Sequence, residues 1–168
     1  MEPRIDYARV APGALAAMLG LSKYLKECAV DKPLLDLIYL RASQINGCAY
    51  CIDMHWKDLR AEGESEQRLY GLDAWAESTW YTDRERAALA WTEAVTLLTD
   101  GHVPDSVYEE ARRMFSEAEL VDLTLAIVTI NGWNRLNVAF RSPAGSYQPP
   151  AKAGAEEKGR PAGAGKER

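Results

Sequence analysis

The sequence predicts an all-α protein, an antiparallel helical bundle built round a helical hairpin that carries a Cys-x-x-Cys motif. Apolar residues recur at helical spacing along most of residues 1–141, and no stretch shows the strict alternation of a half-buried strand. Proline in first turns and glycine after last turns mark where helices begin and end. Since 168 residues suffice to bury one core, we expect one helical domain at residues 1–141.

Composition narrows the class of protein. A hydrophobic share of 47% with 27% charged residues is ordinary for a soluble globular chain. The net charge of −5 and the isoelectric point near 5.1 argue against nucleic acid as a partner, because phosphate binding needs a concentrated basic face. The apolar run 11–21 is too short to span a bilayer and has no clear cleavage site. We therefore expect a cytoplasmic protein without membrane contact.

Two helices precede the motif. The first is expected from Pro12 to about Cys28, with Cys28 as a small buried apolar residue. Asp31 is then a candidate N-cap, with Pro33 in the first turn of the next helix. That helix, residues 34–45, is apolar on most of its circumference, which marks it as the central buried element.

A helical hairpin is expected at the motif, because Asn46 and Gly47 form a turn signal. Asp36 lies ten residues before Asn46 and His55 nine residues after it, which places each roughly 14 to 15 Å along its helix. A carboxylate within this apolar run needs a partner. Spacing leaves two alternatives open, since Asp36 either faces His55 or points to solvent at the helix start.

Capping residues predict the remaining helices. The motif helix ends at Gly63, and Ser65 caps a short helix that continues to Trp75. Further helix starts lie at Thr82, Asp105 and Ser116, of which Thr82 and Ser116 open capping boxes. The polar stretch 131–135 in the last helix is either buried in hydrogen bonds or at an interface. Residues 142–168 are rich in Pro, Gly, Ala, Lys and Glu, so we expect a disordered tail that is dispensable for folding.

The motif itself joins two thiols and an imidazole. On a helix, Cys48 and Cys51 share one face at roughly 5 to 6 Å, within disulfide range. His55 lies one further turn along the same stripe. In a chain without an export signal, such a motif is more often a redox or metal site than a structural disulfide.

Three interpretations of these residues differ in chemistry. In the redox interpretation, one cysteine attacks a peroxide or disulfide and the other closes a Cys48–Cys51 disulfide, while His55 takes the thiol proton and Asp36 holds the imidazole. In the metal interpretation, the same four side chains bind structural zinc, although three ligands from one helix strain a tetrahedral shell. In the third, they are small buried residues with a satisfied histidine. The spacing favours the redox interpretation, with neither a metal nor a cofactor.

Two effects decide which sulfur attacks. A helix beginning at Gly47 would stabilise a Cys48 thiolate through its dipole, by roughly 0.3 to 1 kcal/mol. His55 is one turn from Cys51 and two turns from Cys48. A base within hydrogen-bond reach outweighs the dipole, which favours Cys51 as the nucleophile.

The spacing Asp36-x11-Cys48-x2-Cys51-x3-His55 resembles the core of the alkylhydroperoxidase D-like branch of the carboxymuconolactone decarboxylase family. Similarity covers about residues 15 to 141 and includes Ala61–Glu64, Trp75, Glu85–Leu89 and Ile130–Arg135. The resemblance implies an all-helical fold assembled into trimers or hexamers, and thiol-dependent reduction of hydroperoxides. It also implies that Cys51 attacks, Cys48 resolves, and the acid and the histidine relay protons.

Two residues depart from the family pattern. Asp36 stands where glutamate is usual, so the relay must be closer or bridged by water. Tyr50 stands where the peroxidase branch can carry a second histidine, and a phenol with a pKa near 10 is a poor base. The decarboxylase branch lacks the paired cysteines. The implied partners are a small hydroperoxide and a thiol reductant, either a dithiol or a lipoyl-type protein. The alternatives are a thiol-disulfide oxidoreductase without peroxidase activity and a zinc-binding structural protein.

Overall fold

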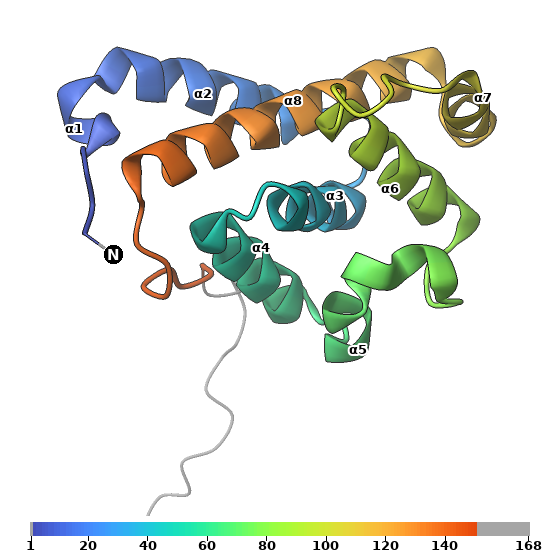
Figure 1. Ribbon diagram of the computed structural model, residues 1–168, viewed down its shortest axis with the longest axis horizontal. Helices are drawn as coiled ribbons and strands as arrows, with labels where there is room; N and C mark the ends of the chain where they lie inside the picture. The colour runs from blue at the N-terminus through green and yellow to red at the C-terminus, as the bar shows by residue number, and fades with distance from the viewer. Residues whose placement is uncertain (1, 151–168) are drawn as a thin grey trace, which may run out of the picture.

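The computed structural model describes residues 2–150 and is helical throughout, with no strand in that range (Figure 1). This confirms the all-α class. None of the described helices is long and apolar enough to cross a bilayer. The elements are α1 (Tyr7–Val10), α2 (Pro12–Leu25), α3 (Lys32–Ile45), α4 (Ala49–Glu62), α5 (Glu66–Tyr70), the 3-10 helix η1 (Leu72–Glu77), α6 (Asp83–Thr96), α7 (Asp105–Met114) and α8 (Glu117–Phe140).

The predicted caps fix where the helices begin and end. The Asp31 side chain accepts a hydrogen bond from the Leu34 N–H and opens α3. Both capping boxes form, one from Thr82 and Glu85 at α6 and one from Ser116 and Glu119 at α8. Gly63 ends α4 at φ 102°, a left-handed conformation that favours glycine. These starts agree with the sequence-based expectations, whereas at α7 the N-cap is Pro104 and not Asp105, which is the first helical residue.

Helix α3 occupies the centre of the molecule, with α4, α6 and α8 packed around it (Figure 1). Ile38 faces a core cluster shared with α6, α7 and α8, whereas Leu37 and Leu40 face a second cluster with α4, α5 and η1. Because the helix is covered on several sides, it is apolar on most of its circumference. The prediction that it is the central buried element is confirmed.

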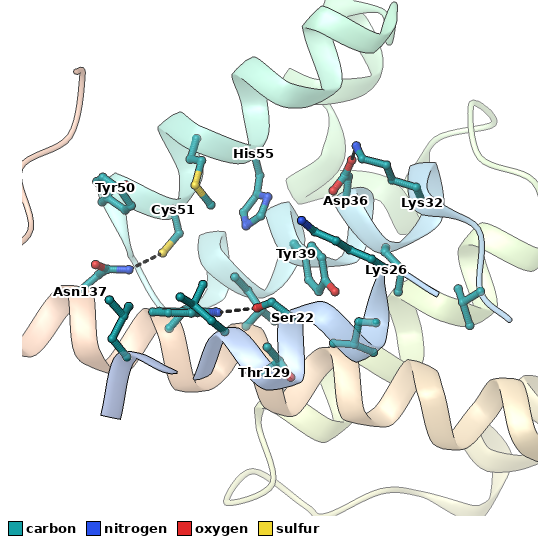
Figure 2. A pocket seen from close by; sticks show the side chains of 18 of the residues that line it. Ser22, Lys26, Lys32, Asp36, Tyr39, Tyr50, Cys51, His55, Thr129 and Asn137 are labelled. Atoms are coloured by element: carbon teal, nitrogen blue, oxygen red, sulfur yellow. Dashed lines mark hydrogen bonds and ion pairs between the residues drawn. The ribbon is translucent and has the colours of Figure 1, made fainter. Parts of the chain in front are cut away.

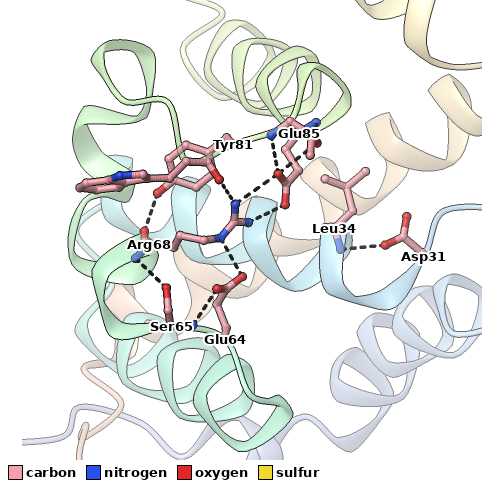
Figure 3. Close-up of polar contacts among 9 residues, drawn as sticks. Asp31, Leu34, Glu64, Ser65, Arg68, Tyr81 and Glu85 are labelled. Carbon is pink, nitrogen blue, oxygen red and sulfur yellow. Dashed lines mark hydrogen bonds and ion pairs between the residues drawn. The ribbon is translucent and has the colours of Figure 1, made fainter.

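The segment between α4 and α6 differs from the single short helix expected. It contains α5 and η1, separated at Gly71, where an added Cβ would lie 2.3 Å from Cζ3 of the Trp80 ring. The Arg68 guanidinium ties α5 to its surroundings, at 3.1 Å from Glu64 and 2.5 Å from Glu85 (Figure 3). The close approach of the Trp80 ring leaves no room for a side chain at Gly71, which is the C-cap of α5.

The chain past Arg141 returns to α4. Tyr147 donates a hydrogen bond to Asp58 at 2.7 Å, and Lys57 donates to the carbonyls of Gly145 and Tyr147 at 3.1 and 3.0 Å. These contacts differ from an expectation of no packing beyond residue 141. The rest of the predicted tail, 151–168, lies outside the described residues, and the domain boundary stays a prediction.

Candidate active site

The turn between α3 and α4 presents the motif. Gly47 adopts φ 63°, and the Asn46 side chain donates a hydrogen bond to the Ala42 carbonyl at 2.9 Å. The Cys48 N–H then donates to the Ser43 carbonyl at 3.0 Å, which places Cys48 at the N-cap of α4. The antiparallel hairpin predicted from the sequence is therefore formed, with Cys51 in the first turn of α4.

The two motif sulfurs are in direct contact. The Sγ atoms of Cys48 and Cys51 lie 2.7 Å apart as free thiols, and each residue is only 1% exposed. The hydrogen bond from Cys51 lowers the pKa of Cys48 to about 7, whereas the same bond and burial raise the pKa of Cys51. One ionisation near neutral pH therefore leaves a single proton shared between the sulfurs.

His55 is buried without a hydrogen bond. Within residues 2–150, neither ring nitrogen has a partner, although the side chain is only 7% exposed. Its ring lies 5.2 Å from the Tyr39 ring, centroid to centroid. Burial lowers the pKa of His55 to about 4, so the imidazole is neutral at pH 7 and able to accept a proton.

Asp36 is buried and paired with a cation. Its carboxylate lies 2.5 Å from the Lys32 ammonium, which also contacts Glu62. Burial raises the pKa of Asp36, and the hydrogen bond from Lys32 opposes that rise. The solvent-facing alternative is therefore wrong, because Asp36 is only 7% exposed. Asp36 and His55 face one cavity, yet no hydrogen bond joins them directly.

Sequence reasoning missed Asn137 on α8. Its side-chain nitrogen lies 3.3 Å from the Cys51 sulfur, and its oxygen accepts a hydrogen bond from the Tyr7 hydroxyl at 3.1 Å. One helical turn earlier, Asn134 donates to Ser43 and accepts from Asn46. Within the polar segment 131–135, Asn134 is thus buried in hydrogen bonds, whereas Arg135 is exposed. The run of asparagines was visible, but nothing in the sequence pointed to contact with the cysteines.

A cavity of about 740 Å³ opens onto Cys51, His55 and Asp36 (Figure 2). Tyr50 lies on its wall, whereas Cys48 is not among the lining residues. Most of the wall is apolar, from Leu15, Leu19, Leu25, Val30, Leu35, Met54, Ile130 and Trp133. An apolar molecule that enters this cavity therefore meets Cys51 and not Cys48.

Within the described part of the chain, no three His, Cys, Asp or Glu side chains are grouped to hold a metal ion. The Asp36 carboxylate is paired with the Lys32 ammonium, and the two sulfurs are turned toward each other. The chemistry of this donor set is that of a reduced dithiol beside a neutral base.

The protein is thus an all-helical bundle in which one cysteine of a buried pair lines a mainly apolar cavity. The model of the carboxymuconolactone decarboxylase family matches residues 12–94. The uncharacterised protein YdfG of Bacillus subtilis is 42% identical over 146 residues, which cover 87% of this chain and 99% of YdfG. The chain belongs to the carboxymuconolactone decarboxylase family, as its sequence predicts.

Solved structures extend the comparison. ATU0492 of Agrobacterium tumefaciens, a protein of unknown function and candidate antioxidant defence protein AhpD, matches with a TM-score of 0.84 at 43% identity. The match covers 87% of this chain and 100% of that one. The debrominase Bmp8 matches with a TM-score of 0.70 at 24% identity, over 80% of this chain and 73% of its own. At that identity, Bmp8 shares the fold alone.

Proposed function

We propose that this protein is a thiol-dependent peroxidase that reduces hydroperoxides through a reversible Cys48–Cys51 disulfide. The observation that carries the proposal is the contact between two reduced sulfurs, 2.7 Å apart, of which only Cys51 lines the cavity. The likeness to the AhpD-type protein ATU0492 supports it. The paired cysteines argue against lactone decarboxylation.

The proposed reaction has two chemical steps. The Cys51 thiolate attacks the terminal oxygen of the hydroperoxide, the O–O bond breaks, and one proton is taken up to give an alcohol and a Cys51 sulfenic acid. The Cys48 thiol then displaces the sulfenic oxygen as water and forms the disulfide. The two sulfurs supply both electrons, and a dithiol reductant restores the thiols by exchange.

Access favours Cys51 as the nucleophile, even though the lowered pKa places the negative charge first on Cys48. Moving the shared proton across the 2.7 Å between the sulfurs transfers that charge to Cys51. Asn137 donates a hydrogen bond to the Cys51 sulfur, and His55 lies one turn after Cys51 on α4. Cys48, at the N-cap and away from the cavity, is placed to resolve.

His55 and Asp36 are assigned proton transfer. A neutral imidazole accepts the proton that leaves a thiol, and the Asp36 carboxylate stabilises the imidazolium from across the cavity, through water in the absence of a direct bond. Because the Lys32 ammonium partly neutralises Asp36, this stabilisation of the imidazolium is weaker than that from a carboxylate with no cation beside it. Asp36 therefore acts on His55 from across the cavity, and not through a direct hydrogen bond to the imidazole.

Burial restricts both substrates. The cavity is far larger than hydrogen peroxide requires and mainly apolar, which favours an organic hydroperoxide with an apolar body. Since each sulfur is only 1% exposed, a disulfide on a globular protein surface cannot reach the pair. The same restriction applies to the reductant, so a small dithiol or a lipoyl-type group on a flexible arm is favoured. Thiol-disulfide exchange without peroxidase activity is the alternative.

Assembly and location also stay proposals. We propose a homo-oligomer, because Leu19 on α2 and Val121 and Val128 on α8 are large apolar residues that are half or more exposed. A trimer or a hexamer is what the resemblance to the family implies. The cytoplasmic location expected from the sequence stays a prediction.

Mass spectrometry after substoichiometric hydroperoxide tests the proposal. We expect a loss of two hydrogens that peptide mapping assigns to Cys48 and Cys51, with Cys28 unchanged. One equivalent of alcohol should form per disulfide, and a dithiol should restore the original mass. Both motif thiols remaining free after hydroperoxide, or Cys28 becoming linked, would exclude the proposed reaction. Disulfide formation without alcohol would favour the exchange alternative.

A further inference from the structure

The amide of Asn137 has a defined orientation. Its oxygen accepts from the Tyr7 hydroxyl at 3.1 Å, which leaves its nitrogen to face the Cys51 sulfur at 3.3 Å. The amide nitrogen therefore donates to the Cys51 sulfur, while the amide oxygen is occupied by the Tyr7 hydroxyl.

Tyr7 is itself held in place by the N-terminal segment. Its ring lies 5.8 Å from the Phe140 ring, and the Arg4 N–H donates to the Phe140 carbonyl at 3.0 Å. These contacts fix α1 on the end of α8, one turn beyond Asn137 (Figure 1). Burial raises the pKa of Tyr7, so its hydroxyl remains a donor at neutral pH.

We propose that Tyr7 and Asn137 form a hydrogen-bond relay that stabilises the thiolate of Cys51. Asn137 acts on the reacting sulfur directly, whereas Tyr7 is a positioning residue that keeps the amide nitrogen turned toward it. Without the Tyr7 hydroxyl, the amide is free to rotate and present its oxygen, an acceptor that repels the thiolate. The relay rests on the proposed function for its role in catalysis, but the ionisation of Cys51 is measurable without any peroxide.

The test is the pH dependence of Cys51 alkylation by iodoacetamide, in a background of Cys28→Ser and Cys48→Ser that leaves only this thiol. Asn137→Ala should raise the midpoint by about one to two pH units, as expected for losing a hydrogen bond to a charged group. Tyr7→Phe should also raise the midpoint, by about half a pH unit or more. The effect is smaller because the Asn137 amide, no longer held by Tyr7, still donates to Cys51 part of the time.

Tyr24→Phe provides a matched control. Tyr24 on α2 donates to Asp122 on α8 at 2.8 Å, a bond of the same kind as that of Tyr7 but made by a residue that does not line the cavity. The midpoint in Tyr24→Phe should equal that of the background. An equal shift in Tyr24→Phe would mean that the α8 packing has loosened, and would overturn the relay.

An unchanged midpoint in Tyr7→Phe would also overturn it, whatever the Asn137 variant shows. Tyr7→Phe decides the question alone if Asn137→Ala fails to fold, since it deletes one oxygen atom. If the midpoints shift as expected while hydroperoxide leaves Cys48 and Cys51 reduced in the parent, the relay stands and the proposed function fails.

Discussion

His55 should make the protein sensitive to acid, and replacing it by a side chain that does not titrate should remove that sensitivity. The imidazole is buried, and its pKa is lowered from the ordinary 6.5 to about 4. Above pH 6.5 the histidine is neutral in both the folded and the unfolded chain, so its titration does not change the free energy of unfolding. As the pH falls below 6.5, the unfolded chain takes up a proton that the folded protein does not, and the free energy of unfolding decreases.

The size of this loss follows from the shift. At 1.36 kcal/mol per unit, lowering the pKa from 6.5 to about 4 corresponds to about 3 kcal/mol, lost between pH 6.5 and pH 4 and constant below that range. This is a large share of the 5 to 15 kcal/mol typical of a domain of this kind. Carboxylates titrate in the same interval, so the quantity to compare is the difference between two variants.

Urea unfolding at pH 7 and pH 4 measures that quantity in the parent and in His55→Gln. The parent should lose about 3 kcal/mol more than the variant on acidification. His102→Gln removes the other histidine, which is exposed in a turn, and should follow the parent. An equal loss in the parent and in His55→Gln would contradict this prediction, because it would mean that the imidazole is protonated within the fold at no cost.

Two further predictions concern the cysteines and the C-terminal segment. In Cys48→Ser, hydroperoxide should still oxidise one thiol to a sulfenic acid that dimedone traps, whereas Cys51→Ser should abolish the fast reaction; sulfenic acid at Cys48 in the latter variant would reverse the two roles. Ending the chain after Arg141 removes the hydrogen bonds of Tyr147 and Gly145 to α4, so the melting temperature should fall by about 2 to 4 °C. Ending it after residue 150 keeps these bonds and should leave the melting temperature unchanged, and equal melting temperatures for the two truncations would show that the segment contributes nothing.

Local signals explain why much of the fold could be predicted. A capping box such as Thr82 with Glu85 places its partners three residues apart, so the sequence contains the whole interaction. The Gly71 break could not be found in this way. The Trp80 ring packs against Gly71, and a glycine in a helical pattern does not reveal which side chain approaches it.

The candidate site likewise contains residues that the sequence spacing predicts and residues that only the packing of the helices reveals. Cys51 and His55 lie one turn apart on α4 and Cys48 is its N-cap, so the sequence spacing alone places all three at the start of one helix. Asp36 was expected to need a partner, but helix spacing does not fix rotation about the helix axis, and Lys32, one turn earlier on α3, pairs with it. Asn137 lies 86 residues from Cys51, so only the packing of α8 against α4 reveals the contact.

The protonation states of the two cysteines and His55 assign His55 to one of the two steps of the proposed reaction. Once the sulfur pair has lost one proton, attack by Cys51 needs no base, and the imidazole is neutral at pH 7. Oxidation of Cys51 removes the thiol that holds the pKa of Cys48 low, and Cys48 must then lose its own proton to close the disulfide. A neutral imidazole with both nitrogens unpartnered within residues 2–150 is suited to accept it. In the proposed mechanism, His55 therefore contributes more to resolution than to attack, and the low pKa caused by its burial favours passing that proton on to the departing hydroxyl, which leaves as water.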